Sequence, residues 1–561
     1  MTEAKPAYRN PFLWVPSSYL AMGLIYVAVG SVANVMFKNM GMDNASAAFW
    51  SSILGFPYTF KFIWAPLLEL YKTKKFFVVL MQFCLAVSMA VVAFALLLPG
   101  MTWLVPVLLL LAVSAILGAT QDIGSDGVYV TTLVPKDQAK YTGFQSMCWN
   151  AGALLAAGPL IYFTGVLHEG YSSLSMREIT SPSAFMEKVQ EKKDPISAFL
   201  SDQFEKFAQA DAEKHDDSEK ADVKPKDAVL LQRLNRIVEG PSIYNKGLFQ
   251  NVTLRPETVA LLSGELHGDK RSHLNRLLLE DAYPDDFLRH QKTWDWNRSW
   301  MTIMLIIAGL LLFAGLYHTS VLPPGAKSLD APRSFADAMG TFGRAFLTFF
   351  QKKDVWLMIA FAFFYRTGFG LIDKIGPLFM IDDRAKGGLG LDNQMLGTIN
   401  GTIGFGAFIV GSILGGWFVS RAGLKKSLLT LCLCLNVPNV TFLILSQLLP
   451  TNIYFIGTVV TFEKLSWGIG CVGHMIYMMQ QIAPGPYKTA HYTIATALMG
   501  ACMMLTGAIS GRIQELVGYQ WFFIIVLLAA IPSILVTVLA PFHHPDSAGP
   551  SAAEATEELK P

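Results

Sequence analysis

Residues 119–127 read Ala119-Thr120-Gln121-Asp122-Ile123-Gly124-Ser125-Asp126-Gly127 and place two carboxylates four residues apart. They stand near the end of an apolar run that begins at Met101. Four residues make about one helical turn, so both acids project from nearly the same face of a helix. A carboxylate inside a bilayer costs roughly 2.5 kcal/mol or more, and such groups usually face a protein interior or a water-filled path. The pair therefore indicates a polar path through a membrane-embedded bundle.

The composition of the whole chain also favours a membrane protein. Of its 561 residues, 52% are hydrophobic and 15% are charged, whereas average soluble proteins carry about 25% charged residues. No basic run accompanies the formal net charge of +2, so nucleic acid is not an expected partner. All six cysteines fall in apolar segments without metal-ligand spacing, and we expect no disulfide framework, metal or cofactor.

The apolar runs predict twelve membrane-spanning helices. A bilayer crossing needs about 20 apolar residues, and Gly or Pro inside such a run does not argue against a spanning helix. The first run is too long for a signal peptide, so we expect it to remain as a membrane anchor. The expected spans are residues 13–36, 46–69, 75–98, 102–132, 140–166, 299–320, 355–381, 393–420, 426–448, 453–482, 489–514 and 518–542.

Lys and Arg predict the orientation of these helices. They gather in alternate short loops, which by the positive-inside rule face the cytoplasm, and this makes both termini cytoplasmic. The opposite loops are nearly free of positive charge apart from Lys38, Arg384 and Lys386. The expected organisation is helices one to five in 1–166, an external hydrophilic insert in 167–298, helix six in 299–320, a cytoplasmic linker in 321–354, six further helices in 355–542, and a disordered cytoplasmic tail in 543–561.

A similar loop follows the second and the eighth helix. The later copy reads Gly416-Trp-Phe-Val-Ser420-Arg421-Ala-Gly423-Leu-Lys425-Lys426, and the earlier one reads Pro66-Leu-Leu-Glu69-Leu-Tyr-Lys72-Thr-Lys74-Lys75. Equivalent loops in two six-helix halves are typical of the parallel repeat of major facilitator transporters, and the pattern resembles their cytoplasmic gate motif. The fold class predicted is an all-α membrane protein of that kind. Candidate gate residues are Glu69, Asp126, Ser420, Arg421, Gly423, Lys425 and Lys426.

Charged residues inside the predicted helices are the candidates for substrate and proton sites. Lys61 on the second helix lies at a height similar to that of Asp122 on the fourth, so the two are expected to pair. Such a pair either opens as the cavity changes access or statically holds two helices together. Asp126 is one turn nearer the cytoplasm, where a gate pair with a loop lysine is the alternative.

The C-terminal half supplies a second set of charges. We expect Arg366 to pair with Glu463, and Asp373 with Lys464, from their estimated depths. The planar fork of Arg suits carboxylates and phosphates, so Arg366 either holds an acidic group of the substrate or forms a structural bridge. Glu463 is the preferred proton site, because desolvation raises the pKa of a buried carboxyl group.

Three further polar residues have two interpretations each. His474 is either a hydrogen-bonded core residue or a proton relay. Asn150 and Asn400 either bind sugar hydroxyls or bond neighbouring helices.

The segment Gln121-Asp122-Ile-x-x-Asp126-Gly resembles the signature of AmpG-type muropeptide permeases and acetyl-CoA transporters. The resemblance implies a major facilitator fold with proton-driven uptake of a sugar-containing or acidic solute. The chain departs from it in the external insert, in Tyr129 near the position often filled by Trp, and in Glu69 without a following Arg. Segments with similar order are Phe60-Lys61-Phe-x-Trp64-x-Pro66-Leu, Tyr365-Arg366-x-Gly368, Phe462-Glu463-x-Leu465-x-x-Gly468-x-Gly470 and Thr489-Ala-x-Tyr492.

These patterns predict a monomeric, proton-coupled importer of a small saccharide or muropeptide fragment in a bacterial inner membrane, and not an enzyme. No Walker loop is present in the sequence, so we do not expect ATP to drive transport. One alternative is a transporter-derived sensor or scaffold whose insert binds a periplasmic partner. Another is a carrier of acyl-CoA or another organic anion, for which Arg366, Lys374 and Lys464 supply cations.

Overall fold

The computed structural model describes residues 10–65, 68, 72–98, 103–133, 135–179, 285–325, 335–485 and 487–544. It divides into two units, of which the first comprises Met1–Val166 with Asn297–Pro561 and the second Leu167–Trp296. Of the second unit the structure describes only the parts that belong to α9 (Ile161–Ile179) and α15 (Asp285–Val321). Most of the predicted insert and of the predicted tail therefore lies outside the described residues.

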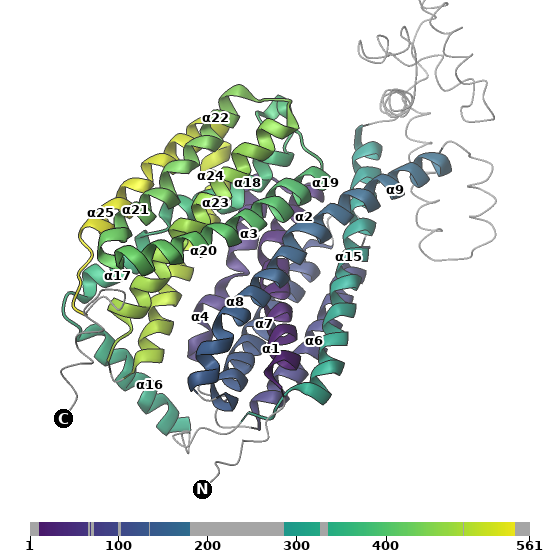
Figure 1. Cartoon of the computed structure of the whole chain (residues 1–561). Coiled ribbons are helices and arrows are strands. Elements are labelled where there is room, and N and C mark those ends of the chain that lie inside the picture. Colours follow the sequence, from purple (N-terminus) through teal and green to yellow (C-terminus); the bar gives the residue numbers. More distant parts are fainter. Residues whose placement is uncertain are drawn as a thin grey trace, which may run out of the picture. The chain divides into compact units, whose positions relative to one another are not determined.

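The first unit is a helical bundle whose two halves are joined in the chain by α16 (Phe335–Phe350) (Figure 1). The described helices of the N-terminal half are α1 (Pro11–Val27), η1 (Ala28–Val32), α2 (Ala33–Asn39), α3 (Asn44–Ile53), α4 (Phe56–Phe60), η2 (Lys61–Ile63), α6 (Lys74–Ala95), α7 (Leu104–Thr132), α8 (Pro135–Leu155), η3 (Ala156–Leu160), α9 and α15. Those of the C-terminal half are α17 (Val355–Phe364), α18 (Thr367–Ile381), η4 (Arg384–Lys386), α19 (Asn393–Leu396), η5 (Gly397–Ile403), α20 (Gly404–Ala422), α21 (Leu424–Asn436), η6 (Val437–Asn439), α22 (Val440–Leu448), α23 (Ile453–Tyr477), η7 (Met478–Ile482), α24 (Lys488–Leu528) and α25 (Ala530–Val538).

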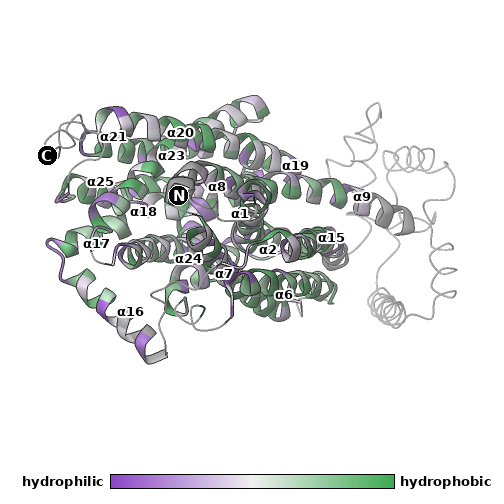
Figure 2. Cartoon of the chain, turned by 60° about the horizontal axis from the view of Figure 1, so that its bottom comes forward, coloured by the Kyte–Doolittle hydropathy of each residue, from purple (hydrophilic) through white to green (hydrophobic). Residues whose placement is uncertain are grey.

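The twelve predicted crossings can be followed in this bundle. Ten segments among the described residues are long and apolar enough to span a membrane, and Figure 2 shows hydrophobic residues along most of the helices. The last segment, Ala490–Val538, holds two predicted spans, because Gly518 with φ 76° breaks α24. The predicted span 46–69 is absent from the ten, because it is divided among the short helices α3, α4 and η2.

Glycines allow helices of the same half to touch through their backbones. A Cβ atom added to Gly23 of α1 would lie 1.9 Å from the carbonyl oxygen of Trp149 on α8. One added to Gly411 of α20 would lie 2.0 Å from the carbonyl oxygen of Leu465 on α23. Small residues permit this close approach, which is how helices pack in lipid, where the hydrophobic effect does not drive them together.

Several crossings contain a widened, π-helical turn. Two of these turns, η3 and η5, belong to different halves and pack against each other: a Cβ atom on Gly401 of η5 would lie 2.1 Å from the carbonyl oxygen of Ala157 on η3. π-Turns are rare and often lie at functional positions in a helix. Here they form one of the places where the halves meet.

The contacts between the halves gather at one end of the bundle. We call the end at which α1 begins, at Pro11, the terminal end, and the end at which α2 stops, at Asn39, the distal end. At the distal end, Asn39 and Asn393 bond each other, with Nδ2 of Asn393 donating at 2.7 Å. One turn deeper, Nδ2 of Asn34 donates to the carbonyl oxygen of Lys374 at 2.8 Å. The halves are therefore closed against each other distally.

Candidate functional site

The ammonium group of Lys61 forms an ion pair with the carboxylate of Asp122, as the sequence predicts. Lys61 is the first residue of the 3-10 turn η2, and Asp122 lies on α7. The indole nitrogen of Trp64 donates to Thr120 Oγ1 at 3.2 Å and fastens the same turn to α7. The Lys61 and Asp122 side chains are 27% and 15% exposed, so other side chains do not fully enclose the pair.

Asp126 lies one turn further along α7 and contacts α1. The hydroxyl group of Tyr19 donates to Asp126 Oδ1 at 2.8 Å, and the ring of Tyr19 packs edge-on against Tyr129 at 5.9 Å. The side chains of residues 135–140, in the region that follows α7, lie outside the described residues. The predicted pairing of Asp126 with a loop lysine therefore stays a prediction.

Arg366 stands at a break in the seventh crossing. The chain leaves the helical conformation there, with φ −110° and ψ 18° at Arg366, and α17 ends just before the break while α18 begins just after it. Nη2 of Arg366 donates to the carbonyl oxygen of Cys471 at 3.4 Å, and the Tyr365 hydroxyl donates to that of Gly470 at 3.0 Å. Both residues at the break are thus anchored on α23.

The predicted pairing of Arg366 with Glu463 is wrong. Glu463 pairs instead with its sequence neighbour Lys464, at 3.2 Å. The crossings that carry Arg366 and Glu463 run in opposite directions, and Arg366 lies opposite Cys471, eight residues beyond Glu463. At 1.5 Å per residue this is a difference in height of roughly 12 Å.

The predicted pairing of Asp373 with Lys464 is also wrong. Asp373 lies 3.8 Å from the ammonium group of Lys374, the next residue on α18. The ammonium group of Lys464 lies 5.4 Å from the centre of the Trp467 ring, in addition to its ion pair with Glu463. Neighbours on the same helix thus take the places of the predicted partners.

Arg366 has no acidic partner among the described residues, where the ion pairs involve other side chains. Its Nε atom is buried without a hydrogen-bond partner there. Tyr26 of α1, which is 45% exposed, lies within electrostatic range of Arg366, Asp373, Asp122 and Lys61. Charged side chains of both halves therefore lie in the region around Tyr26, a residue that sequence reasoning missed because a single Tyr on an apolar helix carries no pattern.

Tyr492 of α24 is a second tyrosine near both sets of charges. It lies within electrostatic range of Arg366 in its own half and of Lys61 and Asp126 in the other. The sequence pointed to Tyr492 only as part of the segment Thr489-Ala-x-Tyr492, without assigning it a role. Tyr26 and Tyr492 thus place one aromatic hydroxyl group from each half near the charged residues.

His474 has the surroundings of a core residue. It is fully buried, with its ring 4.7 Å from that of Tyr365 and 5.6 Å from that of Phe361. The burial and ring contacts are those of a core residue, but the expected hydrogen bonds are missing, because both ring nitrogens are buried without a hydrogen-bond partner among the described residues. A role in proton relay is untested.

Asn150 and Asn400 lie in different halves and are both partly exposed. The amide group of Asn150 donates to the carbonyl oxygen of Ser146, one turn earlier on α8, at 2.8 Å. Asn400 is part of the π-turn η5. Binding of sugar hydroxyls by either residue stays a prediction.

The predicted gate loop of the C-terminal half lies between α20 and α21. The guanidinium group of Arg421 stacks on the Trp417 ring at 4.4 Å, and the Ser420 hydroxyl donates to the carbonyl oxygen of Trp417 at 2.7 Å. Gly423 adopts φ 80°, which permits the sharp turn from α20 into α21. These contacts all lie within the C-terminal half.

The remaining gate candidates are two lysines and one acid. The Lys425 ammonium group lies 5.8 Å from the centre of the Phe542 ring, near the end of the described chain. Lys426 is exposed. Glu69 lies outside the described residues, so its predicted place in the gate has no structural description.

Comparison with known proteins was made by sequence and by structure. No protein-family model matches the chain. It is 23% identical over 240 residues to the anhydromuropeptide permease of Escherichia coli (strain K12), an alignment that covers 43% of this chain and 47% of that protein. It is 18% identical over 245 residues to the putative transporter AmpG 4 of Rickettsia conorii, covering 43% and 56%. The chain thus spans about half the length of the curated relatives it matches.

Solved transporter structures match nearly the whole chain. The D-xylose–proton symporter aligns with a TM-score of 0.54 and 10% identity over 95% of this chain and 97% of its own. The inward-open xylose transporter XylE from E. coli aligns with a TM-score of 0.52 and 10% identity over 98% and 99%. The chain has a major facilitator fold and resembles AmpG-type permeases.

In a major facilitator fold, two six-helix halves surround a central site and rock about it, so that the site faces one side of the membrane at a time. This chain has charged groups in both halves near Tyr26 and Tyr492. The contacts between its halves run from the distal end down to Thr59 of α4, which faces Gly500 of α24. The candidate site is therefore the region around Lys61, Asp122 and Arg366.

Proposed function

We propose that the chain is a proton-coupled secondary transporter, and not an enzyme, that imports a small saccharide or muropeptide-like solute across a bacterial inner membrane. The observation that carries this proposal is that the Lys61–Asp122 ion pair of one half and Arg366 of the other, which has no acidic partner among the described residues, lie in one region around Tyr26. A central site contributed by two halves that meet mainly at one end is what alternating access requires. The relatives named as permeases support the same class of solute.

In this proposal Arg366 binds an acidic group of the solute. Its guanidinium group has no carboxylate partner among the described side chains, and it is fixed by the carbonyl oxygen of Cys471 rather than by a charge. A guanidinium group presents a planar fork that matches a carboxylate or a phosphate. A bound anion would supply the missing counter-charge, which favours solutes with an acidic group.

Lys61 and Asp122 act as the responsive pair of the N-terminal half. The pair joins the second and fourth crossings and is partly exposed. Breaking one ion pair at this position would free Asp122 to take up a proton and Lys61 to meet the solute. Glu463, which is 1% exposed and paired only with the adjacent Lys464 among the described residues, is the second proton-binding candidate.

The terminal end faces the cytoplasm in this proposal. The distribution of Lys and Arg among the loops supports it, because basic loops are retained on the cytoplasmic side. With the halves closed distally, the described conformation then gives access from the cytoplasm. The chain acts as a monomer, and residues 167–298 lie on the periplasmic side.

Uptake into proteoliposomes tests this function. Purified protein is assayed against sugars, anhydro-muropeptides and acyl-CoA, with and without an inward proton gradient and with an uncoupler. We expect uptake of one solute class that depends on the gradient and is abolished by the uncoupler. Gradient-independent uptake would refute proton coupling, and uptake of no solute by folded protein would refute the transport function.

Deleting residues 185–290 tests whether the chain is a transporter or a transporter-derived sensor or scaffold. We expect transport to survive the deletion, which would make the insert accessory. If the deletion abolishes binding of a periplasmic partner, and neither the full chain nor the shortened one transports a solute, the sensor or scaffold would be favoured instead.

A further inference from the structure

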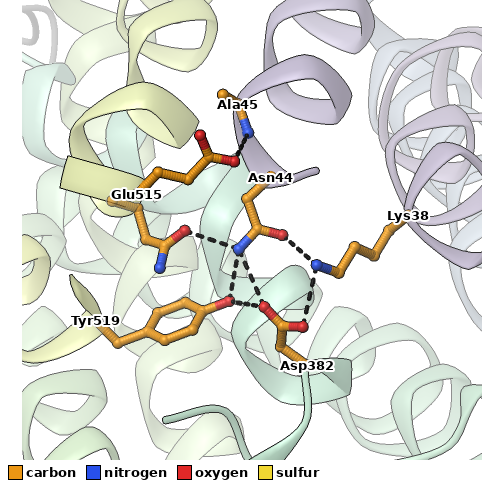
Figure 3. A network of polar contacts seen from close by, with 7 residues as sticks. Lys38, Asn44, Ala45, Asp382, Glu515 and Tyr519 are labelled. Atoms are coloured by element: carbon orange, nitrogen blue, oxygen red, sulfur yellow. Dashed lines mark hydrogen bonds and ion pairs between the residues drawn. The ribbon is translucent and has the colours of Figure 1, made fainter. Parts of the chain in front are cut away.

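A buried polar network joins the two halves at the distal end, away from the charges around Arg366 (Figure 3). Lys38 from α2 and Asn44 from α3 belong to the N-terminal half. Asp382, directly after α18, and Gln514 and Tyr519 from α24 belong to the C-terminal half. We call these five residues the distal latch.

Asp382 is the centre of the latch and uses both carboxylate oxygens. Oδ1 lies 3.0 Å from the Lys38 ammonium group. Oδ2 accepts a hydrogen bond from the Tyr519 hydroxyl at 2.8 Å and another from the Asn44 amide at 3.1 Å. Two of its three partners therefore come from the opposite half.

Asn44 contacts all four other members of the latch, and its Nδ2 lies 2.9 Å from the Tyr519 hydroxyl. Its Oδ1 accepts from the Lys38 ammonium group at 2.6 Å, and its Nδ2 donates to Gln514 Oε1 at 2.7 Å. The next backbone N–H, that of Ala45, donates to Glu515 Oε1 at 3.0 Å. The start of α3 is thus held by two consecutive side chains of α24.

The backbone around Asp382 fixes its carboxylate in place. The carbonyl oxygen of Asp382 accepts from the N–H of Gly390 at 2.9 Å. A Cβ atom on Gly388 would lie 2.2 Å from that same oxygen, so only glycine fits there. The loop after α18 therefore presents Asp382 in one position, ready for its partners.

Burial makes the latch dependent on contact between the halves. Asp382 is 6% exposed and Asn44 is 5% exposed, although both lie at the end of the bundle, where separated halves would leave them in water. Charged groups that lose their water need partners with good geometry, and these partners are supplied across the interface. When the halves separate, water replaces the partners, so the latch forms and breaks without leaving an unpaired charge buried.

We propose that the distal latch sets the balance between the conformation closed at the distal end and the conformation open there, with Lys38 and Asp382 as its essential pair. The inference rests on the proposed function only in assuming that the halves rock. It assigns to Lys38 and Asp382 a role separate from solute or proton binding. Losing one partner should therefore favour distal opening.

Labelling of a cysteine introduced by Ser52→Cys measures this opening. Ser52 of α3 is 3% exposed and faces Gly507 of α24, two turns of helix below Asn44. In a chain whose six native cysteines are replaced, the rate at which the introduced thiol reacts with a maleimide in detergent reports how often the halves separate there. The same chain with Ser52 retained is the blank.

We expect Asp382→Asn and Lys38→Ala each to raise the labelling rate about tenfold, and the double variant to add little, because both remove the same interaction. Arg384→Ala is the matched control, since Arg384 stands in the same loop but bonds the carbonyl oxygens of Leu389, Leu449 and Pro450 within its own half. It should leave the rate unchanged.

Thermal unfolding of every variant is measured as well, because faster labelling could come either from distal opening or from loss of the fold. Labelling at the parental rate in folded Asp382→Asn and Lys38→Ala would overturn the proposal, as would an equal increase in Arg384→Ala. The labelling rate reports conformation and not transport, so the two proposals can fail separately. If the variants label as expected but the protein transports nothing, the latch proposal is supported and the transport proposal is refuted. If the protein transports but the variants label at the parental rate, the transport proposal is supported and the latch proposal is refuted.

Discussion

Gly401→Ala should push the two halves apart at the distal end. The added Cβ atom would lie 2.1 Å from the carbonyl oxygen of Ala157, about 1.3 Å short of the 3.4 Å at which ordinary contact begins. It would also lie 2.4 Å from Cα of Gly158, so backbone rather than a flexible side chain must move. Overpacking of this kind costs typically 1–3 kcal/mol.

The cost falls on only one of the two conformations, because Gly401 and Ala157 belong to different halves. The equilibrium should therefore shift toward distal opening by about five- to 150-fold, since each 1.4 kcal/mol is a factor of about ten. The labelling rate of a cysteine at position 52 measures that shift. Thermal unfolding measured in parallel should change little.

Two glycines of α20, the helix that follows η5, are the controls. Gly411→Ala meets the carbonyl oxygen of Leu465 at 2.0 Å within one half, so it should lower thermal stability in both conformations and leave labelling unchanged. Gly406→Ala meets nothing within 4 Å and should change neither quantity. If Gly401→Ala lowers stability as Gly411→Ala does, without faster labelling, the reasoning about the interface is refuted.

Three further predictions concern charges. Asp122→Asn and Glu463→Gln should each abolish gradient-driven uptake with thermal stability preserved; uptake at the parental rate would remove that residue from coupling. Arg366→Lys should raise the KM for an acidic solute at least tenfold with little change for a neutral analogue, because the fork is lost; an equal change for both solutes would contradict this. The pKa of Asp382 is raised by burial but lowered more by the Lys38 ammonium group and its hydrogen bonds, so it lies below the ordinary value. A group whose pKa is lowered in the closed state stabilises that state above the ordinary pKa of the group, about 3.9 for Asp, and this effect is lost only as the pH falls further. The labelling rate at position 52, normalised to that of a free thiol, should therefore be constant from pH 8 to pH 5. Faster normalised labelling at pH 5 would refute this prediction.

The sequence predicted well the features that depend on hydrophobic length and on direction along a helix. Lys61 and Asp122 lie on crossings that run the same way, so counting from the same end gave compatible heights, and the ion pair is present. Arg366 and Glu463 lie on crossings that run in opposite directions, so errors in the two ends added together. The ion pair of Glu463 with its neighbour Lys464 could not be foreseen from depth.

The sequence did not predict the distal latch, for a different reason. Lys38 was visible as one of the few basic residues in the loops expected to be external, and this was the signal that could have found it. Its partner Asp382 is far away in sequence and stands beside Asp383, so nothing in the pattern selected it. Ion pairs between the two halves depend on how the halves pack against each other, and the residue pattern of a single sequence does not determine this packing.

The π-turns impose a rule about chain length that substitutions do not reveal. A π-turn closes its hydrogen bond over five residues instead of four, so η5 accommodates one residue more than an α-helical turn would. Removing one residue from Gly397–Ile403 would let the turn close as a regular α-helix, so the helix that follows would keep nearly the same facing. The face of α20 that meets α23 through Gly411 would then stay on its partner, whereas a residue removed from α20 before Gly411 would turn that face by about 100°. We therefore expect the chain to tolerate the loss of one residue better in the π-turn than in the regular helix that follows it.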